Sequence, residues 1–232
     1  MIGIIGAMDQ EVRTLVNEMS EKSVNKKAGM EFCSGRLLGK DVTVVISGVG
    51  KVSAAACTQI LVDDYHVDAV INSGVAGSLD SRIDIGDIVV STDAVQHDVE
   101  ATIWGYMPGE IPILKKAYFE ADPGLRKVIV DACRKVNTDI HVFEGRVASG
   151  DQFVSSMEQK KKIRDTFHAC CAEMEGCAIA QTAWLNRIPF VIIRAISDKA
   201  DNSATMDYNE FEKKAIEHSL ALLRAALPQL NY

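Results

Sequence analysis

The chain has 232 residues, of which 47% are hydrophobic and 25% charged, and it carries a formal net charge of −7. This length and apolar share predict a single globular domain, residues 1–232, and argue against disorder. The acidic balance argues against nucleic acid as a partner, because it would repel a phosphate backbone. We interpret the run Lys160-Lys161-Lys162 as a solvated face.

Apolar runs in this chain are all shorter than the roughly 20 residues that a bilayer-spanning helix requires. Residues 1–11 lack the basic start of a signal peptide, so we expect no membrane segment and no export. The six cysteines lack metal-binding spacing and lie mostly among Ala, Val and Ile. We therefore interpret them as small buried hydrophobic residues and expect a reducing, cytoplasmic location.

Taken in chain order, short β-branched runs alternate with longer helical patterns. The predicted strands are Ile2–Ile5, Glu31–Leu37, Val42–Ser47, Ala69–Asn72, Asp87–Thr92, Val142–Ala148, Ala169–Ala172 and Phe190–Ile196. The predicted helices are Gln10–Met19, Lys51–Asp64, Pro123–Lys135, Ser156–Asp165, Glu175–Leu185 and Tyr208–Ala226. Several strands are continuous apolar runs, which is typical of strands covered on both faces. The order predicts an α/β fold with a mostly parallel or mixed sheet between helices.

One long stretch, Gln96–Phe119, follows no regular pattern, which is typical of a lid or binding loop. It carries an apolar and aromatic set that is too large to leave in water, namely Ile103, Trp104, Tyr106, Pro108 and Pro112. Two interpretations stay open at this point: packing against its own subunit, or contact with a partner subunit.

Turns that carry glycines or acids come directly after the predicted strands. They are GAMDQE (6–11), SGVGK (47–51), SGVAGS (73–78), SGDQF (149–153), EMEG (173–176) and SDKAD (197–201). The carboxyl ends of parallel strands share one edge of a sheet, where open α/β sheets bind ligands. We therefore expect Glu11, Glu175 and Asp198, far apart in sequence, to face one pocket.

The glycine-rich turns do not match the known nucleotide loops. A P-loop ending in Gly50-Lys51 would need glycine at position 45, where valine stands, and a dinucleotide loop would need glycine at position 53, where serine stands. We interpret the glycines as letting a flat ligand approach the backbone. The run His97-Asp98-Val99-Glu100 lacks a second histidine and argues only weakly for a metal.

Each acid at a helix start has a simple explanation, since a carboxylate there accepts the free N–H groups and opposes the helix dipole. That suffices for Glu173, Glu175 or Asp198 taken alone. Two such acids at neighbouring strand ends, with Glu11 at a third, exceed what capping explains. The constellation predicts a catalytic pocket.

Distinctive stretches are distributed from Ile2 to Asp201: GIIGAMDQEV, SGVGKVSAA, VINSGVAGSL, GDIVVS, VASGDQFV, EMEGCAIAQ and VIIRAISDKAD. In combination they closely resemble the methylthioadenosine/S-adenosylhomocysteine nucleosidases of the purine nucleoside phosphorylase superfamily. The resemblance implies a three-layer α/β/α sandwich with a mixed, partly barrel-like central sheet, a homodimer, and neither metal nor cofactor. It also implies a role in methionine salvage and S-adenosylmethionine recycling.

The resemblance also implies roles for the three acids. Glu11 corresponds to the glutamate that activates water, Glu175 to the glutamate that binds the ribose hydroxyls, and Asp198 to the aspartate that protonates adenine N7. Ser197 supports Asp198. Positions that match the purine and sugar pocket are Met8, Val49, Ala76, Gly77, Phe153, Val154 and Met174.

From the segment 96–119 we add Trp104, Tyr106 and Pro112 to the predicted substrate-binding residues, because the resemblance implies a dimer in which this segment closes the partner's 5′ pocket. Three positions depart from the family pattern. Gln10 replaces an acid often found beside the catalytic glutamate, Val75 stands where some relatives carry serine, and Trp104 stands where phenylalanine is common. The change at Trp104 bears on the shape of the alkylthio pocket, and with it on the preference between short and long 5′ substituents.

The chemistry is consistent with these roles. Breaking an N-glycosidic bond builds positive charge on the sugar and negative charge on the purine, so one neutral acid and one ionised base are needed. Alternatives are a nucleoside phosphorylase, a 6-amino-6-deoxyfutalosine hydrolase, and a nucleoside-binding or storage protein; 5′-deoxyadenosine is a further candidate substrate. The acids of GAMDQE would repel phosphate. We expect Arg13 to point away from Glu11, and Arg194 to orient the carboxylates.

Overall fold

The computed structural model describes the backbone of residues 1–232 and every side chain except those of residues 205–210 and 212. Its core is a closed barrel of five strands within a ten-stranded sheet. The barrel strands are β5 (Ala69–Ser78), β10 (Phe190–Asp198), β6 (Ile88–Gln96), β8 (Val142–Ser149) and β9 (Cys171–Glu173). The barrel closes because β10 pairs with both β5 and β6.

The sheet continues beyond β5 as a flatter wing. Its strands are β1 (Ile2–Gly6), β4 (Lys40–Ile46), β3 (Met30–Leu37) and β2 (Ser20–Lys27), and the short β7 (Tyr118–Glu120) pairs with β6. Strands β4, β1, β5 and β10 run parallel to one another, so the ends of β1 and β10 lie on the same side as the end of β5.

The predicted mostly parallel or mixed sheet is mixed, and strand β9 does not run parallel to β5, as the expectation of one shared strand edge had assumed. It runs antiparallel to β5, where it pairs with Gly77 and Ser78, the last residues of that strand, and it runs parallel to β8 on its other side. From there β9 leads back into the barrel. The EMEG turn therefore reaches the common pocket because the barrel closes, and not because its strand is parallel to the others.

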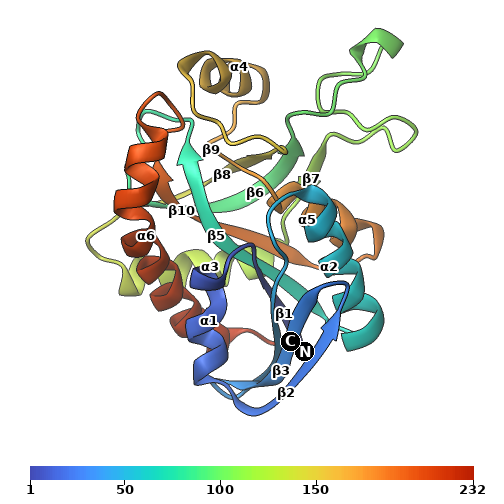
Figure 1. The fold of residues 1–232 in the computed structure, drawn as a ribbon, viewed down its shortest axis with the longest axis vertical. Helices are drawn as coiled ribbons and strands as arrows, with labels where there is room; N and C mark the ends of the chain where they lie inside the picture. The colour runs from blue at the N-terminus through green and yellow to red at the C-terminus, as the bar shows by residue number, and fades with distance from the viewer.

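Helices cover the sheet on two sides (Figure 1). The helices are α1 (Asp9–Glu18), α2 (Lys51–Tyr65), α3 (Pro123–Val136), α4 (Met157–Phe167), α5 (Gly176–Leu185) and α6 (Ala204–Ala226). Helix α6 packs on β10, β5, α1 and α3, whereas α2 packs on α5 against the opposite face. Two apolar clusters fill the space between these layers, one on each side of the sheet.

Local sequence signals explain where the helices begin. Asp122 accepts the N–H of Leu125 at 2.8 Å, and Pro123 occupies the first turn, so α3 begins there. Ser156 accepts the N–H of Gln159 at the start of α4. The predicted strands and helices are all present, with ends shifted by a few residues.

The differences have physical reasons. Strand β2, SEKSVNKK, was not predicted because all of its residues are exposed and it has no apolar alternation. The predicted turn at 73–78 is wrong, since β5 continues through it to Ser78. The solvated-face interpretation is wrong for Lys160, whose stem lies on the buried face of α4.

The cysteines agree with the sequence interpretation at all positions but one. Cys170 is half-buried, and the other five are buried. No helix in the described part of the chain is long and apolar enough to cross a membrane.

Candidate active site

A cavity of about 260 Å³ lies where β1, β5 and β10 end and β9 turns inward. Its walls are mostly apolar, with acids at the base. The lining residues are Ala7, Met8, Glu11, Val49, Val75, Ala76, Gly77, Phe153, Ala172, Glu173, Met174, Glu175, Ser197 and Asp198. The structure therefore brings the three predicted acids, which come from distant parts of the sequence, to one cavity.

Glu11 lies in the first turn of α1 and points back toward β1. Its Oε2 accepts the N–H groups of Ala7 at 2.6 Å and Met8 at 2.9 Å, and its Oε1 accepts that of Val75 at 3.3 Å. Burial raises the pKa of Glu11 above its ordinary value, although these N–H groups and Arg194 oppose the shift. The carboxylate is thus fixed in position and surrounded by groups that favour its charged form.

Asp198 ends β10 and is buried. Its Oδ2 accepts the hydroxyl of Ser197 at 2.9 Å, and its Oδ1 accepts the N–H of Ala200 at 2.7 Å. A Cβ at Gly77 would lie 2.6 Å from Oδ1, and a Cβ at Gly74 would lie 2.8 Å from Oε1 of Glu11. The glycines of β5 therefore make room for the protein's own carboxylates.

Glu175 precedes α5, and its Oε1 accepts the N–H of Gly50 at 2.7 Å. Burial, together with the nearby charge of Glu173, raises the pKa of Glu175 to about 7. This carboxyl group therefore changes its charge close to neutral pH.

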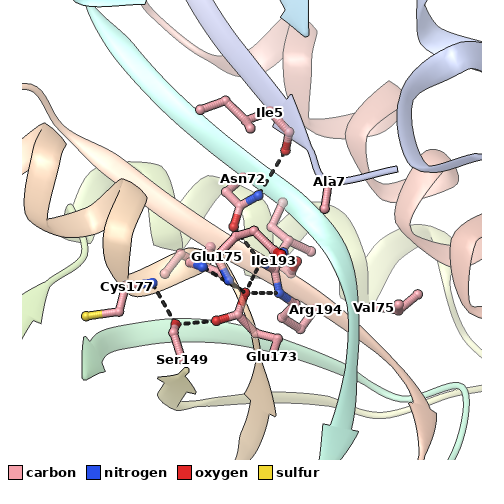
Figure 2. Close-up of polar contacts among 12 residues, drawn as sticks. Ile5, Ala7, Asn72, Val75, Ser149, Glu173, Glu175, Cys177, Ile193 and Arg194 are labelled. Carbon is pink, nitrogen blue, oxygen red and sulfur yellow. Dashed lines mark hydrogen bonds and ion pairs between the residues drawn. The ribbon is translucent and has the colours of Figure 1, made fainter. Parts of the chain in front are cut away.

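Glu173, which lines the cavity, forms a buried ion pair with Arg194 (Figure 2). Glu173 Oε2 also accepts the N–H groups of Glu175 at 3.1 Å and Gly176 at 2.8 Å, while Ser149 donates to the other oxygen. Arg194 donates to Oδ1 of Asn72 at 2.6 Å. Burial raises the pKa of Glu173, but Arg194 and the hydrogen bonds outweigh it and hold that pKa below its ordinary value.

This network bears on two sequence predictions, the capping role of Glu173 and the orienting role of Arg194. The capping interpretation is confirmed for Glu173, which accepts the first N–H groups of α5. Arg194 contacts the carboxylate of Glu173, as expected of a residue that orients the site's acids.

The other basic side chains near the cavity pair with acids. Arg13 points to Asp9 on the exposed side of α1, as expected. Lys51 binds Asp98 at 2.6 Å, so Asp98 of the weak metal motif has an ion-pair partner. Among the described residues that line the cavity there is no lysine, arginine or histidine.

Most predicted binding residues line this cavity. Val49 and Phe153 lie half-exposed at its mouth, and Val154 lines a smaller pocket that adjoins it. Trp104, Tyr106 and Pro112 do not line it; they belong to the segment after β6, which projects away from the barrel (Figure 1).

The sequence interpretation missed Ala7, Ala172 and Glu173 as cavity residues, and it named Val75 only as a departure from the family. For Glu173 the signal was its place two residues before Glu175. For Ala7 and Ala172 the sequence carried no signal, because an alanine beside a strand end has no distinguishing chemistry.

Comparison with known proteins decides the family. A model of the phosphorylase superfamily matches residues 1–228. The 5′-methylthioadenosine/S-adenosylhomocysteine nucleosidase of Staphylococcus aureus is 39% identical over 231 residues, covering 99% of this chain and 100% of that protein. The chain belongs to the methylthioadenosine/S-adenosylhomocysteine nucleosidase family.

Solved structures agree with this nucleosidase assignment. The Neisseria meningitidis nucleosidase in complex with methylthio-immucillin-A has a TM-score of 0.95 and 36% identity, with 99% of both chains covered. A futalosine hydrolase mutant of Helicobacter pylori has a TM-score of 0.93 and 31% identity, again over 99% of both chains. The fold expected from the resemblance, an α/β sandwich with a partly barrel-like sheet, is confirmed.

Proposed function

We propose that this chain hydrolyses the N-glycosidic bond of 5′-methylthioadenosine and S-adenosylhomocysteine, releasing adenine and the thioribose. The observation that carries this proposal is the convergence of Glu11, Glu175 and Asp198 on one mostly apolar cavity. Family membership supports it, since the relatives are named as nucleosidases for these two substrates.

Asp198 acts as the acid at adenine N7. The purine gains negative charge as the bond breaks, and a proton from Asp198 neutralises it. Oδ1 accepts the N–H of Ala200 and Oδ2 accepts the hydroxyl of Ser197, so both oxygens are held in position at the cavity. A buried position suits this role, because a low dielectric disfavours the charged carboxylate.

Glu11 acts as the base that removes a proton from the attacking water. It needs to be ionised, and the N–H groups of Ala7, Met8 and Val75 stabilise that form. Glu175 binds the ribose hydroxyls, which fixes the ring, and its charge stabilises the positive sugar in the transition state.

Water, and not phosphate, is the nucleophile in this proposal. A phosphorylase must bind a dianion next to the anomeric carbon, which calls for cations or a cluster of N–H groups. The described cavity wall instead presents carboxylates, and Arg194 is already paired with Glu173. A phosphate dianion beside Glu11 would be repelled, whereas a neutral water molecule would not.

A second candidate is hydrolysis of 6-amino-6-deoxyfutalosine by the same site. The similarity to the Helicobacter pylori futalosine hydrolase favours it as an additional substrate, because the two chains share the fold over nearly their whole length. We further propose a homodimer and a cytoplasmic location, where five buried cysteines are compatible with a reducing environment.

The test measures adenine and sugar products in phosphate-free buffer, with methylthioadenosine, S-adenosylhomocysteine and 6-amino-6-deoxyfutalosine as separate substrates. We expect free adenine and a reducing sugar, no sugar 1-phosphate, and no rate increase on adding phosphate. A strict phosphate requirement with a 1-phosphate product would establish a phosphorylase. Binding of the nucleosides without release of adenine would establish a binding protein.

A further inference from the structure

Lys160 lies on the buried face of α4, although it belongs to a run of three lysines. Its side chain is only 11% exposed, whereas Lys161 and Lys162 are exposed. Ile163 and Phe167 follow it at helical spacing and belong to the apolar cluster that also contains Ala200. The stem of Lys160 thus points toward the turn that follows Asp198, with an ammonium group at its end.

The ammonium of Lys160 binds the backbone of that turn. Its Nζ donates to the carbonyl of Lys199 at 2.5 Å and lies 4.0 Å from Oδ2 of Asp201. The Lys199 carbonyl belongs to the same peptide group as the N–H of Ala200, and that N–H donates to Oδ1 of Asp198 at 2.7 Å. One peptide group therefore joins Lys160 to the carboxyl group of Asp198.

This connection strengthens the hydrogen bond to Asp198. A cation at a carbonyl oxygen polarises the whole peptide group and makes its N–H a better donor, since hydrogen bonds in a chain polarise one another. The bond to Oδ1 fixes the rotation of the carboxyl group.

The turn needs such support because of its backbone geometry. Ala200 has φ = +51°, in the left-handed region that non-glycine residues adopt only at a cost in free energy. On the other side, Lys199 Nζ binds the carbonyl of Ile83 at 3.0 Å and Asp84 at 2.6 Å. Contacts from two separate parts of the chain thus hold the turn in this conformation.

We propose that Lys160 is a positioning residue for Asp198: through the Lys199–Ala200 peptide group it fixes the orientation of the carboxyl group that faces the purine. This inference rests on the proposed role of Asp198 in the nucleosidase reaction. Lys160 acts through the backbone and takes no direct part in the chemistry.

The charge of Lys160 adds a second effect. The charged groups around its ammonium are Asp201, Lys199, Arg164 and Asp198. A nearby cation favours an ionised carboxylate, so removing the cation lets Asp198 keep its proton to higher pH. The pH at which activity falls on the alkaline side of the activity profile, its alkaline limb, therefore reports on this charge. A loss of packing alone would not shift that pH.

The experiment compares Lys160→Met, which keeps the stem and removes the ammonium, with Lys161→Met, which removes the same charge from an exposed position of the same helix. For Lys160→Met we expect kcat to fall about 10- to 100-fold, as for a misplaced catalytic group, with KM changed by less than about 3-fold. Its alkaline limb should move to higher pH. Lys160→Arg should recover most of kcat, and Lys161→Met should match the wild type.

Adenine binding, measured by calorimetry, gives a readout that does not depend on turnover. We expect Lys160→Met to bind adenine about 10-fold more weakly than Lys161→Met, since a rotated Asp198 no longer meets N7. If the wild-type protein released no adenine from its substrates, the proposed function would be wrong. The comparison of adenine affinities would still test the role of Lys160. Unchanged adenine affinity, or a folded Lys160→Met variant with wild-type kcat and pH profile, would overturn the inference.

Discussion

Each buried acid of the cavity has a different set of hydrogen-bond partners. Glu11 accepts backbone N–H groups at both oxygens, the contacts of Asp198 include the N–H of Ala200 and the hydroxyl of Ser197, and Glu175 accepts the N–H of Gly50. Burial raises the pKa of Glu11, and its three backbone N–H groups together with Arg194 oppose that shift, which suits a group proposed as the base. In the proposed mechanism, the surroundings of these two carboxyl groups, and not their side-chain chemistry, distinguish the base from the acid.

The first prediction concerns these roles. Glu11→Gln keeps the shape of the side chain and loses its basicity, and Asp198→Asn cannot supply a proton. We expect each to lower kcat by a factor of about 10² to 10⁴, the usual contribution of a general acid or base, while Glu11→Gln still binds adenine nucleosides. Glu175→Ala should weaken ribose binding and lower the rate as well.

Steady-state kinetics and nucleoside binding by calorimetry check these roles. Asp9→Asn serves as the control for Glu11→Gln, because Asp9 lies on the same helix and pairs with the exposed Arg13. A near-normal kcat for Glu11→Gln would show that another group activates the water.

At the scale of elements, β9 and α5 depend on one buried ion pair. Glu173 closes β9 and accepts the first N–H groups of α5, and Arg194 reaches the same oxygen from β10. Ser149 binds Glu173 from β8 and accepts the N–H of Cys177 at 2.7 Å. Three barrel strands and the start of α5 thus meet at one carboxylate, which positions Glu175 above it.

The second prediction removes the cation of this pair. Arg194→Met leaves Glu173 buried without its partner, so we expect the free energy of unfolding to fall by about 3–5 kcal/mol. The double variant Arg194→Met/Glu173→Gln should recover part of this loss, because it no longer buries an unpaired charge. Urea denaturation of both variants measures the effect.

Arg36→Met is the control, since Arg36 forms an exposed ion pair with Asp41 at 3.8 Å. Losing this pair should lower the free energy of unfolding by less than about 1 kcal/mol. If Arg194→Met were no less stable than Arg36→Met, the ion pair would not hold these elements together.

At the scale of the whole molecule, the segment between β6 and β7 projects away from the barrel (Figure 1). Its side chains include Ile103, Trp104 and Ile113, which are 88%, 73% and 93% exposed. Val52 at the start of α2 is 82% exposed. Exposed apolar side chains of this kind support the proposed homodimer, in which a second copy of the chain would cover this surface.

The third prediction is therefore a dimer at micromolar concentration, in which this segment closes the partner's 5′ pocket. Ile103→Asp/Ile113→Asp should shift the chain to monomers, since burying two carboxylates in an apolar interface is unfavourable. It should also raise KM for methylthioadenosine. Sedimentation velocity and kinetics on the same samples measure both effects.

Val24→Asp is the matched control, because Val24 is 58% exposed on β2. It should leave the dimer and the activity unchanged. A fully active wild-type monomer would contradict the dimer proposal.

The sequence by itself determined the alternation of strands and helices, the acids at the strand ends and the family. Apolar periodicity and capping residues act over a few positions, so they are readable without a structure; Asp122 before α3 is one example. The acids Glu11, Glu175 and Asp198 were found because each follows an apolar strand.

Only the tertiary structure decided which residues meet. It showed that β9 runs antiparallel to β5, that Gly74 and Gly77 make room for carboxylates, and that Lys160 is buried and contacts the Asp198 turn. These contacts join residues that are distant in sequence, and the packing of strands and helices against one another determines them. Local pattern carries no information about such pairs, because burial depends on which elements pack together.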